Sequence, residues 1–386
     1  MKPNLSISPF SESILEQKSF LLSELQSYGV RLEREEGASS RIGGAGPTDH
    51  KAMNVLGTTI MVPVHTHIAS SSPFSVGSID DRGRVPLYHL GERIVFVSYP
   101  PQPKFYDYST ADGVPYWKIA TLHSKDVLAT TVLQTCIRYG NKNTKCQFCA
   151  IGESLKAGRT IPHKNPEQLT EVALKAQRLD GIKQVVMTTG TPVTDDRGAA
   201  VLAASAKAIK EATGLPIQAQ CEPPADFAWF QRLKDAGVDT LGMHLEAWDE
   251  SVRAEIMPGK AEVPVSYYKK AFRAAVTVFG RGQVSTYLLA GLGDTQEGLI
   301  EAARELIDLG VYPFIVPFVP VTGTQLENHP APSSDFMRAV LEKVGAMLSD
   351  ARMTSDKQKA GCAKCGACSS LSSFEKSSSG NTCVAS

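Results

Sequence analysis

Short apolar segments and helical patterns alternate through the middle of the chain. Apolar, strand-length segments occur at 128–135, 184–188, 216–221, 239–245, 284–290 and 312–318. Apolar residues at helical spacing occur at 166–179, 199–212, 225–236, 265–279, 296–309 and 334–348. Six such βα units, joined by right-handed crossovers, are expected to form a curled parallel sheet. We therefore predict an α/β fold with a partial (β/α)6 barrel over residues 106–350.

The segments on either side of the predicted barrel have a different pattern. Residues 10–35 carry apolar positions at helical spacing, and β-branched runs follow at 58–64 and 93–99. We predict that residues 1–105 form an N-terminal helix and a small β-rich module. The glycine-rich stretch 41–50 is either a loop or a place where the backbone approaches a ligand. Residues 351–386 are predicted to be a cysteine-containing C-terminal tail, with its last dozen residues disordered.

The charge balance and hydrophobicity of the sequence limit the kinds of partner that we expect. Forty basic residues balance forty acidic residues, so no strong field attracts the chain to nucleic acid or to an anionic membrane. The sequence contains neither a signal-peptide pattern nor about 18 consecutive apolar residues. We expect a cytoplasmic protein with a small-molecule partner. In that reducing compartment, its eight cysteines are expected to be metal ligands, catalytic thiols or core residues rather than disulfides.

The first cysteine cluster follows the first predicted strand. Cys136 ends that strand, and Cys146 and Cys149 follow in a C-x-x-C spacing. Three thiolates can bind three irons of a 4Fe-4S cluster and leave the fourth iron open to another ligand. A zinc site with a fourth ligand, or unrelated core cysteines, remain the alternatives.

The second cysteine cluster lies in the predicted tail. Cys362, Cys365 and Cys368 have C-x2-C-x2-C spacing, which is typical of ferredoxin-like cluster ligands. We predict an auxiliary Fe-S cluster, with a zinc knuckle or a redox-labile tail as alternatives. The candidates for its fourth ligand are Cys221, Ser369 and Cys383.

The strand, the cysteine loop and the βα units together resemble the radical SAM superfamily. This resemblance implies a 4Fe-4S cluster whose open iron binds S-adenosylmethionine (SAM). It also implies an electron donor such as flavodoxin or ferredoxin, which drives cleavage of SAM to methionine and a 5'-deoxyadenosyl radical that abstracts hydrogen from substrate. The chain departs from the usual pattern because nine residues, rather than three, separate Cys136 from Cys146.

The same resemblance implies a set of SAM contacts. A small-residue motif after the second strand would contact the amino group of SAM. A segment after the fourth strand resembles lipoyl and biotin synthases. It would supply an acid for the ribose or amino group of SAM and an arginine for its carboxylate. Glycines after the fifth strand and an aromatic residue between two cysteines would border the adenine. Separately from the resemblance, an acid after the third strand is a candidate for a polar contact with SAM or substrate. In this order, the residues are Thr188, Thr189, Gly190, Glu246, Arg253, Gly291, Gly293, Phe148 and Glu222. The alternatives are ordinary turns and an exposed acid and arginine at a helix start.

Over most of its length the chain resembles the radical SAM proteins of bacterial nitrilase gene clusters, which are associated with cyanide assimilation. The glycine-rich stretch, the segment 127–136, the long cysteine spacing and the second cysteine cluster carry this resemblance. It implies hydrogen abstraction from a small, nitrogen-containing metabolite. Sulfur insertion from the second cluster is one alternative, and a non-catalytic Fe-S or zinc binding protein is the other.

Overall fold

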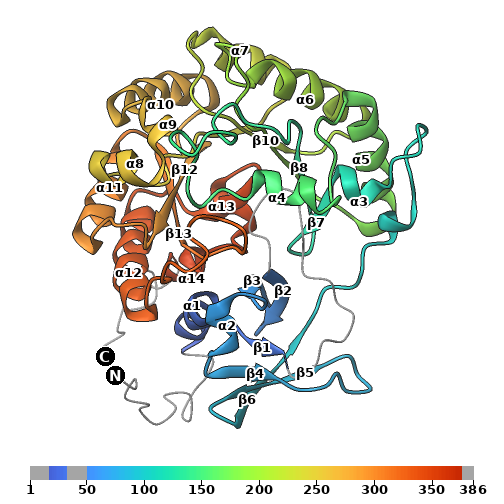
Figure 1. The fold of residues 1–386 in the computed structure, drawn as a ribbon, viewed down its shortest axis with the longest axis vertical. Helices are drawn as coiled ribbons and strands as arrows, with labels where there is room; N and C mark the ends of the chain where they lie inside the picture. Colours follow the sequence, from blue (N-terminus) through green and yellow to red (C-terminus); the bar gives the residue numbers. More distant parts are fainter. Residues whose placement is uncertain (1–16, 33–49, 376–386) are drawn as a thin grey trace, which may run out of the picture.

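A computed structural model describes residues 17–32 and 50–375 (Figure 1). Most of the glycine-rich stretch, the beginning of the predicted N-terminal helix and the ending predicted to be disordered lie outside these residues. The described chain contains two β-sheets, one in the N-terminal module and one in the barrel. None of its helices is both long enough and apolar enough to span a lipid bilayer.

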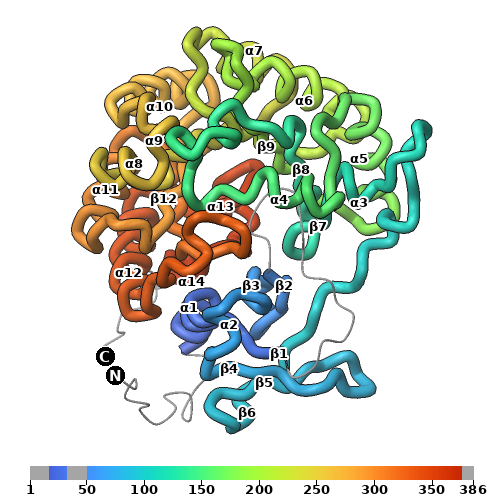
Figure 2. The backbone as a smooth tube through the Cα atoms, in the orientation of Figure 1, coloured from blue at the N-terminus to red at the C-terminus, as the bar shows by residue number. Residues whose placement is uncertain are grey.

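The larger sheet has seven strands in the order β13-β12-β11-β10-β9-β8-β7, and it curls into an open barrel (Figure 2). Its strands are β7 (Thr121–His123), β8 (Val127–Thr131), β9 (Gln184–Thr188), β10 (Ile217–Gln220), β11 (Thr240–Gly242), β12 (Val284–Ala290) and β13 (Val311–Pro317). Strands β8 to β13 are parallel, whereas β7 pairs antiparallel with β8 at one edge. The predicted α/β partial barrel is confirmed, with β7 as an addition.

Helices cover the outside of this sheet (Figure 1). The six predicted helices are α5 (Pro166–Asp180), α6 (Ala199–Thr213), α7 (Ala228–Asp235), α10 (Val265–Phe279), α11 (Gln296–Asp308) and α12 (Ser334–Asp350). Local signals explain the bounds of α5, which starts at a capping box between Asn165 and Gln168 and ends at the left-handed Gly181. Two short helices, α8 (Glu250–Ile256) and α9 (Pro258–Ala261), lie between β11 and α10.

The apolar faces of these helices and the sheet form one large core. Val172 of α5, Ala206 of α6 and Leu306 of α11 are completely buried in it. The same core includes Ala367 and Leu371, which lie beyond the last barrel helix. The segment after α12 is therefore packed as part of the barrel rather than forming a loose tail.

The N-terminal module has a smaller sheet and a core of its own. Its strands are ordered β1-β4-β5-β6-β2-β3 and comprise β1 (Arg31–Leu32), β2 (His50–Val55), β3 (Thr58–Pro63), β4 (Phe74–Val76), β5 (Val85–His89) and β6 (Glu92–Ser98). Leu22 and Leu25 of helix α1 (Lys18–Tyr28) share a buried core with Val55 and Phe74 of this sheet. Short helical segments follow at α2 (His67–Ser70), η2 (Lys104–Asp107), α3 (Tyr116–Ile119) and, beyond β8, α4 (Ile151–Lys156).

The segment after α12 closes the barrel at the amino ends of its strands. It contains η3 (Ser355–Lys357), α13 (Cys362–Cys365) and α14 (Leu371–Phe374). Its backbone bonds to side chains near the starts of four neighbouring strands, namely Gln184, Gln218, Thr240 and Gln283. The N-terminal module supports it from outside, because the Met61 N–H and the Gln26 amide both donate to the carbonyl of Ala367.

Candidate functional site

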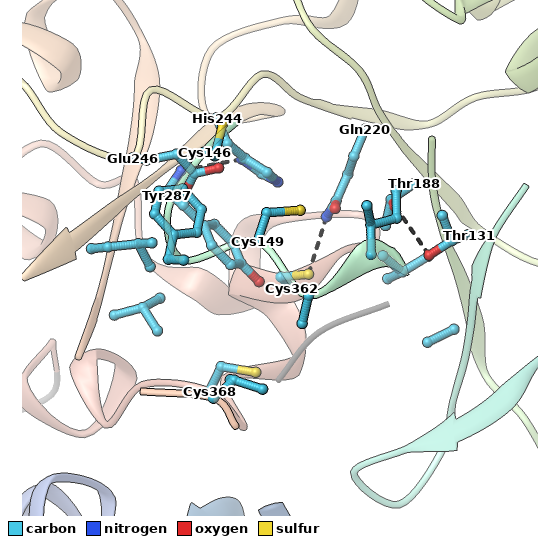
Figure 3. Close-up of a pocket in the computed structure, with 18 of the residues that line it drawn as sticks. Thr131, Cys146, Cys149, Thr188, Gln220, His244, Glu246, Tyr287, Cys362 and Cys368 are labelled. Atoms are coloured by element: carbon cyan, nitrogen blue, oxygen red, sulfur yellow. Dashed lines mark hydrogen bonds between the residues drawn. The ribbon is translucent and has the colours of Figure 1, made fainter. Parts of the chain in front are cut away.

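A cavity of about 420 Å³ occupies the inside of the barrel, and both cysteine clusters line it (Figure 3). The first cluster borders the cavity from the loop after β8. The second borders it from the closing segment at the other end of the strands. Inward-facing strand residues line the cavity between them, among which are Ala129, Thr131, Val186, Thr188, Gln220, His244, Tyr287, Leu289 and Val316. The barrel therefore brings the two clusters, which are more than 200 residues apart in sequence, to one space.

The first cysteine loop is held by its own turns and by α8. The Tyr139 N–H donates to the carbonyl of Cys136, and the Cys149 N–H donates to that of Cys146, each at 3.0 Å. The Gln147 N–H reaches the carbonyl of Ile256 at 2.9 Å. Burial raises the pKa of Cys146 to about 12 and that of Cys149 to about 11, so a bound cation is needed to favour their thiolates.

The predicted small-residue motif lies beside this loop. Thr188, Thr189 and Gly190 all line the cavity, as predicted for residues that would contact SAM. The Gly190 N–H donates to the carbonyl of Leu133 at 2.8 Å, and a Cβ atom on Gly190 would collide with the carbonyl of Thr135. Glycine is thus required here because the chain leading to Cys136 passes directly over it.

A buried ion pair lies near the first cluster. Glu246 follows β11 in a left-handed conformation with φ 70°, and its Oε1 accepts a hydrogen bond from the Lys260 Nζ at 3.0 Å. Both side chains line the cavity. The sequence predicted a role for Glu246 but none for Lys260. Lys260 lies in the short helix α9 and belongs to no recognisable motif. Lys260 is one cationic group available to a ligand carboxylate in this cavity.

Glu222 is a second carboxylate at the cavity, and it has cationic partners of its own. It forms ion pairs with Arg138 and Arg197 and accepts a hydrogen bond from Thr191. Burial alone would raise the pKa of Glu222, but Lys260, Arg138 and the hydrogen bonds outweigh it and hold the pKa below its usual value. Glu222 is therefore charged at neutral pH, and one of its partners, Arg138, comes from the first cysteine loop.

Arg253 has a different place from the predicted one. Its side chain is completely buried, is not part of the cavity lining, and donates to main-chain carbonyls of the segment 245–263. Because both Nη groups are used in this way and the side chain does not reach the cavity, the predicted contact of Arg253 with the SAM carboxylate is not supported. Arg253 instead holds together the connection that positions Glu246 and Lys260.

The glycines after β12 also lie away from the cavity lining. Gly291 packs against Pro332, and Gly293 packs against Val252, both with positive φ. Their predicted approach to the adenine is not supported by these contacts. Phe148 does line the cavity, and it packs with a small apolar cluster that includes Phe318.

Two further cavity residues were not identified from sequence. The His244 ring lies 4.2 Å from the Tyr287 ring, and its Nδ1 accepts a hydrogen bond from the Tyr287 N–H at 3.2 Å. Burial lowers the pKa of His244 to about 4, so its imidazole is neutral and carries its proton on Nε2. The alternation of β12 could have indicated that Tyr287 faces inward, because every second residue shares a face.

The residues present fit an Fe-S cluster at the first cysteines, with an organic ligand beside it. Three thiols, a turn of small residues and a buried ion pair border one cavity. In the described part of the chain, no three His, Cys, Asp or Glu side chains are close enough to hold a single metal ion. A cubane binds each thiolate through a different iron, so it needs a wider spacing than one ion does.

Comparisons with known proteins agree with this site. Residues 143–306 match the model of the Radical SAM superfamily, a range that contains Cys146 and Cys149 but begins after Cys136. Bacteriochlorophyllide c C-7(1)-hydroxylase of Chlorobaculum limnaeum is 33% identical over 132 residues, which is 34% of this chain and 33% of that protein. An uncharacterized protein of Methanocaldococcus jannaschii is 28% identical over 194 residues, or 49% of this chain and 48% of that one.

Among solved structures, methylornithine synthase has a TM-score of 0.43 and 21% identity, over 55% of this chain and 61% of that one. The matched segments cover between a third and a half of the length of the two curated relatives, the hydroxylase and the Methanocaldococcus jannaschii protein.

Proposed function

We propose that this chain, whose residues 143–306 match the radical SAM family, is an enzyme that reductively cleaves SAM at a 4Fe-4S cluster bound by Cys136, Cys146 and Cys149. When bound, the cluster and SAM supply a 5'-deoxyadenosyl radical and methionine after transfer of one electron. The observation that carries the proposal is the single cavity that these three cysteines share with Thr188–Gly190 and the Glu246–Lys260 pair.

The chain's own residues supply binding and orientation. The hydroxyls and backbone of Thr188, Thr189 and Gly190 provide polar contacts for an amino group beside the first cluster. Lys260 provides a positive charge for a carboxylate, the role that the family resemblance gave to Arg253. Phe148 provides an apolar surface suited to the adenine ring.

The cavity limits the size of the substrate. A volume of about 420 Å³ lies at the lower end of ligand sites in proteins, and SAM must share it. The substrate is therefore a small metabolite, from which hydrogen is abstracted. Glu222 and Glu246 are hydrogen-bond acceptors suited to an amino or other N–H group, in agreement with the nitrogen-containing substrate that the resemblance to nitrilase-cluster proteins implies.

A second Fe-S cluster, bound by Cys362, Cys365 and Cys368, is part of the proposal. These three residues border the same cavity from the closing segment. The setting that we propose is the cytoplasm, where a flavodoxin or a ferredoxin supplies the electron.

Anaerobic reconstitution tests the proposal. The protein is loaded with iron and sulfide, reduced and mixed with SAM, and 5'-deoxyadenosine and iron are then measured. We expect about eight irons per chain, as two cubanes carry, and formation of 5'-deoxyadenosine that is lost in Cys146→Ala. Zinc in place of iron, with no 5'-deoxyadenosine under any reductant, would contradict the proposal and favour a non-catalytic binding protein.

The shared cavity also supports sulfur insertion as a second candidate, because a substrate between the two clusters could receive sulfur from the second one. This reaction would remove sulfide from the second cluster in each turnover. Sulfide and iron measured before and after a single turnover distinguish the two reactions. Hydrogen abstraction alone leaves both values unchanged.

A further inference from the structure

The three thiols of the closing segment each have a specific partner from the barrel. Cys362 Sγ accepts a hydrogen bond from the Gln220 amide at 3.1 Å (Figure 3). The Tyr287 hydroxyl also donates a hydrogen bond to Cys362. The Ser124 hydroxyl donates a hydrogen bond to the Cys365 thiol. The fourth contact differs in kind, because the Cys368 Sγ lies 3.4 Å from the Nε2 of His123, a ring nitrogen.

These partners differ in what they can do for a metal centre. The amide and hydroxyl groups of Gln220, Tyr287 and Ser124 donate hydrogen bonds, which stabilise thiolates and tune a cluster from outside. An imidazole nitrogen can bind iron directly, as histidines do when they replace two cysteines on one iron of Rieske clusters. Of the four groups, the His123 imidazole is the best suited to bind iron, because it does so in its neutral form, whereas a hydroxyl must first lose its proton.

The fold holds His123 in this position. It is the last residue of β7, where it pairs in register with Val127 of β8, and its neighbour Ser124 makes the contact to Cys365. The side chain is buried, with 6% exposed, and it lines the same cavity as the three cysteines. The adjacent residues His123 and Ser124 thus contact two of the three thiols, Cys368 and Cys365.

We propose that the Nε2 of His123 is the fourth protein ligand of the metal centre held by Cys362, Cys365 and Cys368. The inference rests on the second cluster of the proposed function. Three thiolates and one imidazole occupy all four irons, so this centre has no open position for substrate. It differs in this respect from the first cluster, whose three cysteines leave one iron open.

The other candidates for the fourth ligand have different contacts. Ser369 is completely buried, and its hydroxyl accepts a hydrogen bond from the Leu371 N–H at 3.2 Å. Cys383 lies outside the described residues. His50 of the N-terminal module is the most informative competitor, because it too is a buried histidine that lines the cavity.

The test uses the full chain with the first cluster removed by Cys136→Ala, Cys146→Ala and Cys149→Ala together, so that any remaining signal belongs to the second cluster. The protein is produced with ¹⁵N-labelled or unlabelled histidine and reconstituted, and its iron, zinc and sulfide are measured. Pulsed electron paramagnetic resonance of the reduced cluster then detects coupling to a histidine nitrogen. His123→Cys and His123→Gln are compared with the matched control His50→Gln.

We expect about four irons per chain and a histidine nitrogen coupling that disappears in both His123 variants but persists in His50→Gln. His123→Cys should keep its iron and have a lower reduction potential, since a neutral ligand is replaced by an anionic one. Four irons without histidine coupling, or with coupling unchanged in His123→Cys, would overturn the inference and leave the second cluster intact. Absence of iron, with or without zinc, would overturn the second cluster itself and the inference with it.

Discussion

The Nζ of Lys260 lies 3.0 Å from the Oε1 of Glu246, and the two side chains are 11% and 13% exposed at the wall of the barrel cavity. The two residues come from different elements, one following β11 and the other within α9. Burial alone would lower the pKa of Lys260, but the attraction of Glu246 outweighs burial and raises it. The Lys260 ammonium therefore remains charged at neutral and mildly alkaline pH.

Lys260→Met should destabilise the fold by about 3 kcal/mol, because it leaves the Glu246 carboxylate buried without its partner. Adding Glu246→Gln to this variant should recover part of the loss. Urea unfolding of the two single variants and the double variant measures the coupling. Lys156→Met is the control, since Lys156 is 71% exposed in its pair with Glu153 and its loss should change stability by less than about 1 kcal/mol. Equal losses in Lys260→Met and Lys156→Met would contradict the importance of the buried pair.

Glu222 should make stability depend on pH in the acid range. Since its pKa is lowered in the folded chain, the charged form contributes stability above its ordinary pKa of about 4.3, and this contribution is lost as the pH falls through the lower folded value. Glu222→Gln should therefore be less stable than the parent at pH 6, and the difference should shrink toward pH 3. Urea unfolding across this range measures it. A difference that is independent of pH would mean that Glu222 acts through packing alone.

Gly190→Ala should disturb the first cysteine loop, because its Cβ would collide with the main chain at Thr135. We expect a loss of about 2 kcal/mol in unfolding free energy, as for other overpacked sites, together with weaker SAM binding. Gly140→Ala is a control within the first cysteine loop itself, because a Cβ atom on Gly140 would meet no atom within 4 Å. Thermal unfolding and calorimetric titration with SAM compare the two variants. Equal stability and equal SAM affinity would argue against a close approach of the Thr135 main chain to Gly190.

Cys221→Ala should retain both clusters. Cys221 is buried in the wall of the cavity but belongs to neither cysteine cluster, and the second strand carries Met187 and Thr188 rather than a companion cysteine. Iron analysis should give about eight irons per chain for this variant and about four for Cys365→Ala. Loss of four irons from Cys221→Ala would instead make Cys221 a ligand of the second cluster.

The periodicity of the sequence predicts the barrel well because its strands and helices carry strong local signals. The ranges 184–188 and 284–290 coincide with β9 and β12. The prediction for 239–245 is too long, since the strand ends at Gly242 and the chain then turns through the left-handed Glu246. Such a turn depends on long-range contacts that periodicity does not contain.

The site could be predicted only in part, for a related reason. Motif spacing groups Cys136, Cys146 and Cys149, which the structure places on one cavity, but a motif does not say where a long side chain points. Arg253 thus turned out to bind main-chain carbonyls. His123 meets Cys368 across 245 residues of sequence, a contact that only the tertiary fold creates.

The closing segment gives the chain an order of assembly. Residues 355–374 seal the amino ends of the barrel strands, yet they follow every one of those strands in the sequence. During synthesis the ribosome releases all six parallel strands before it releases this seal. The amino ends of the strands therefore stay uncovered until residues 355–374 have been made, and the second cysteine cluster is the last of the proposed ligand sets to reach the cavity.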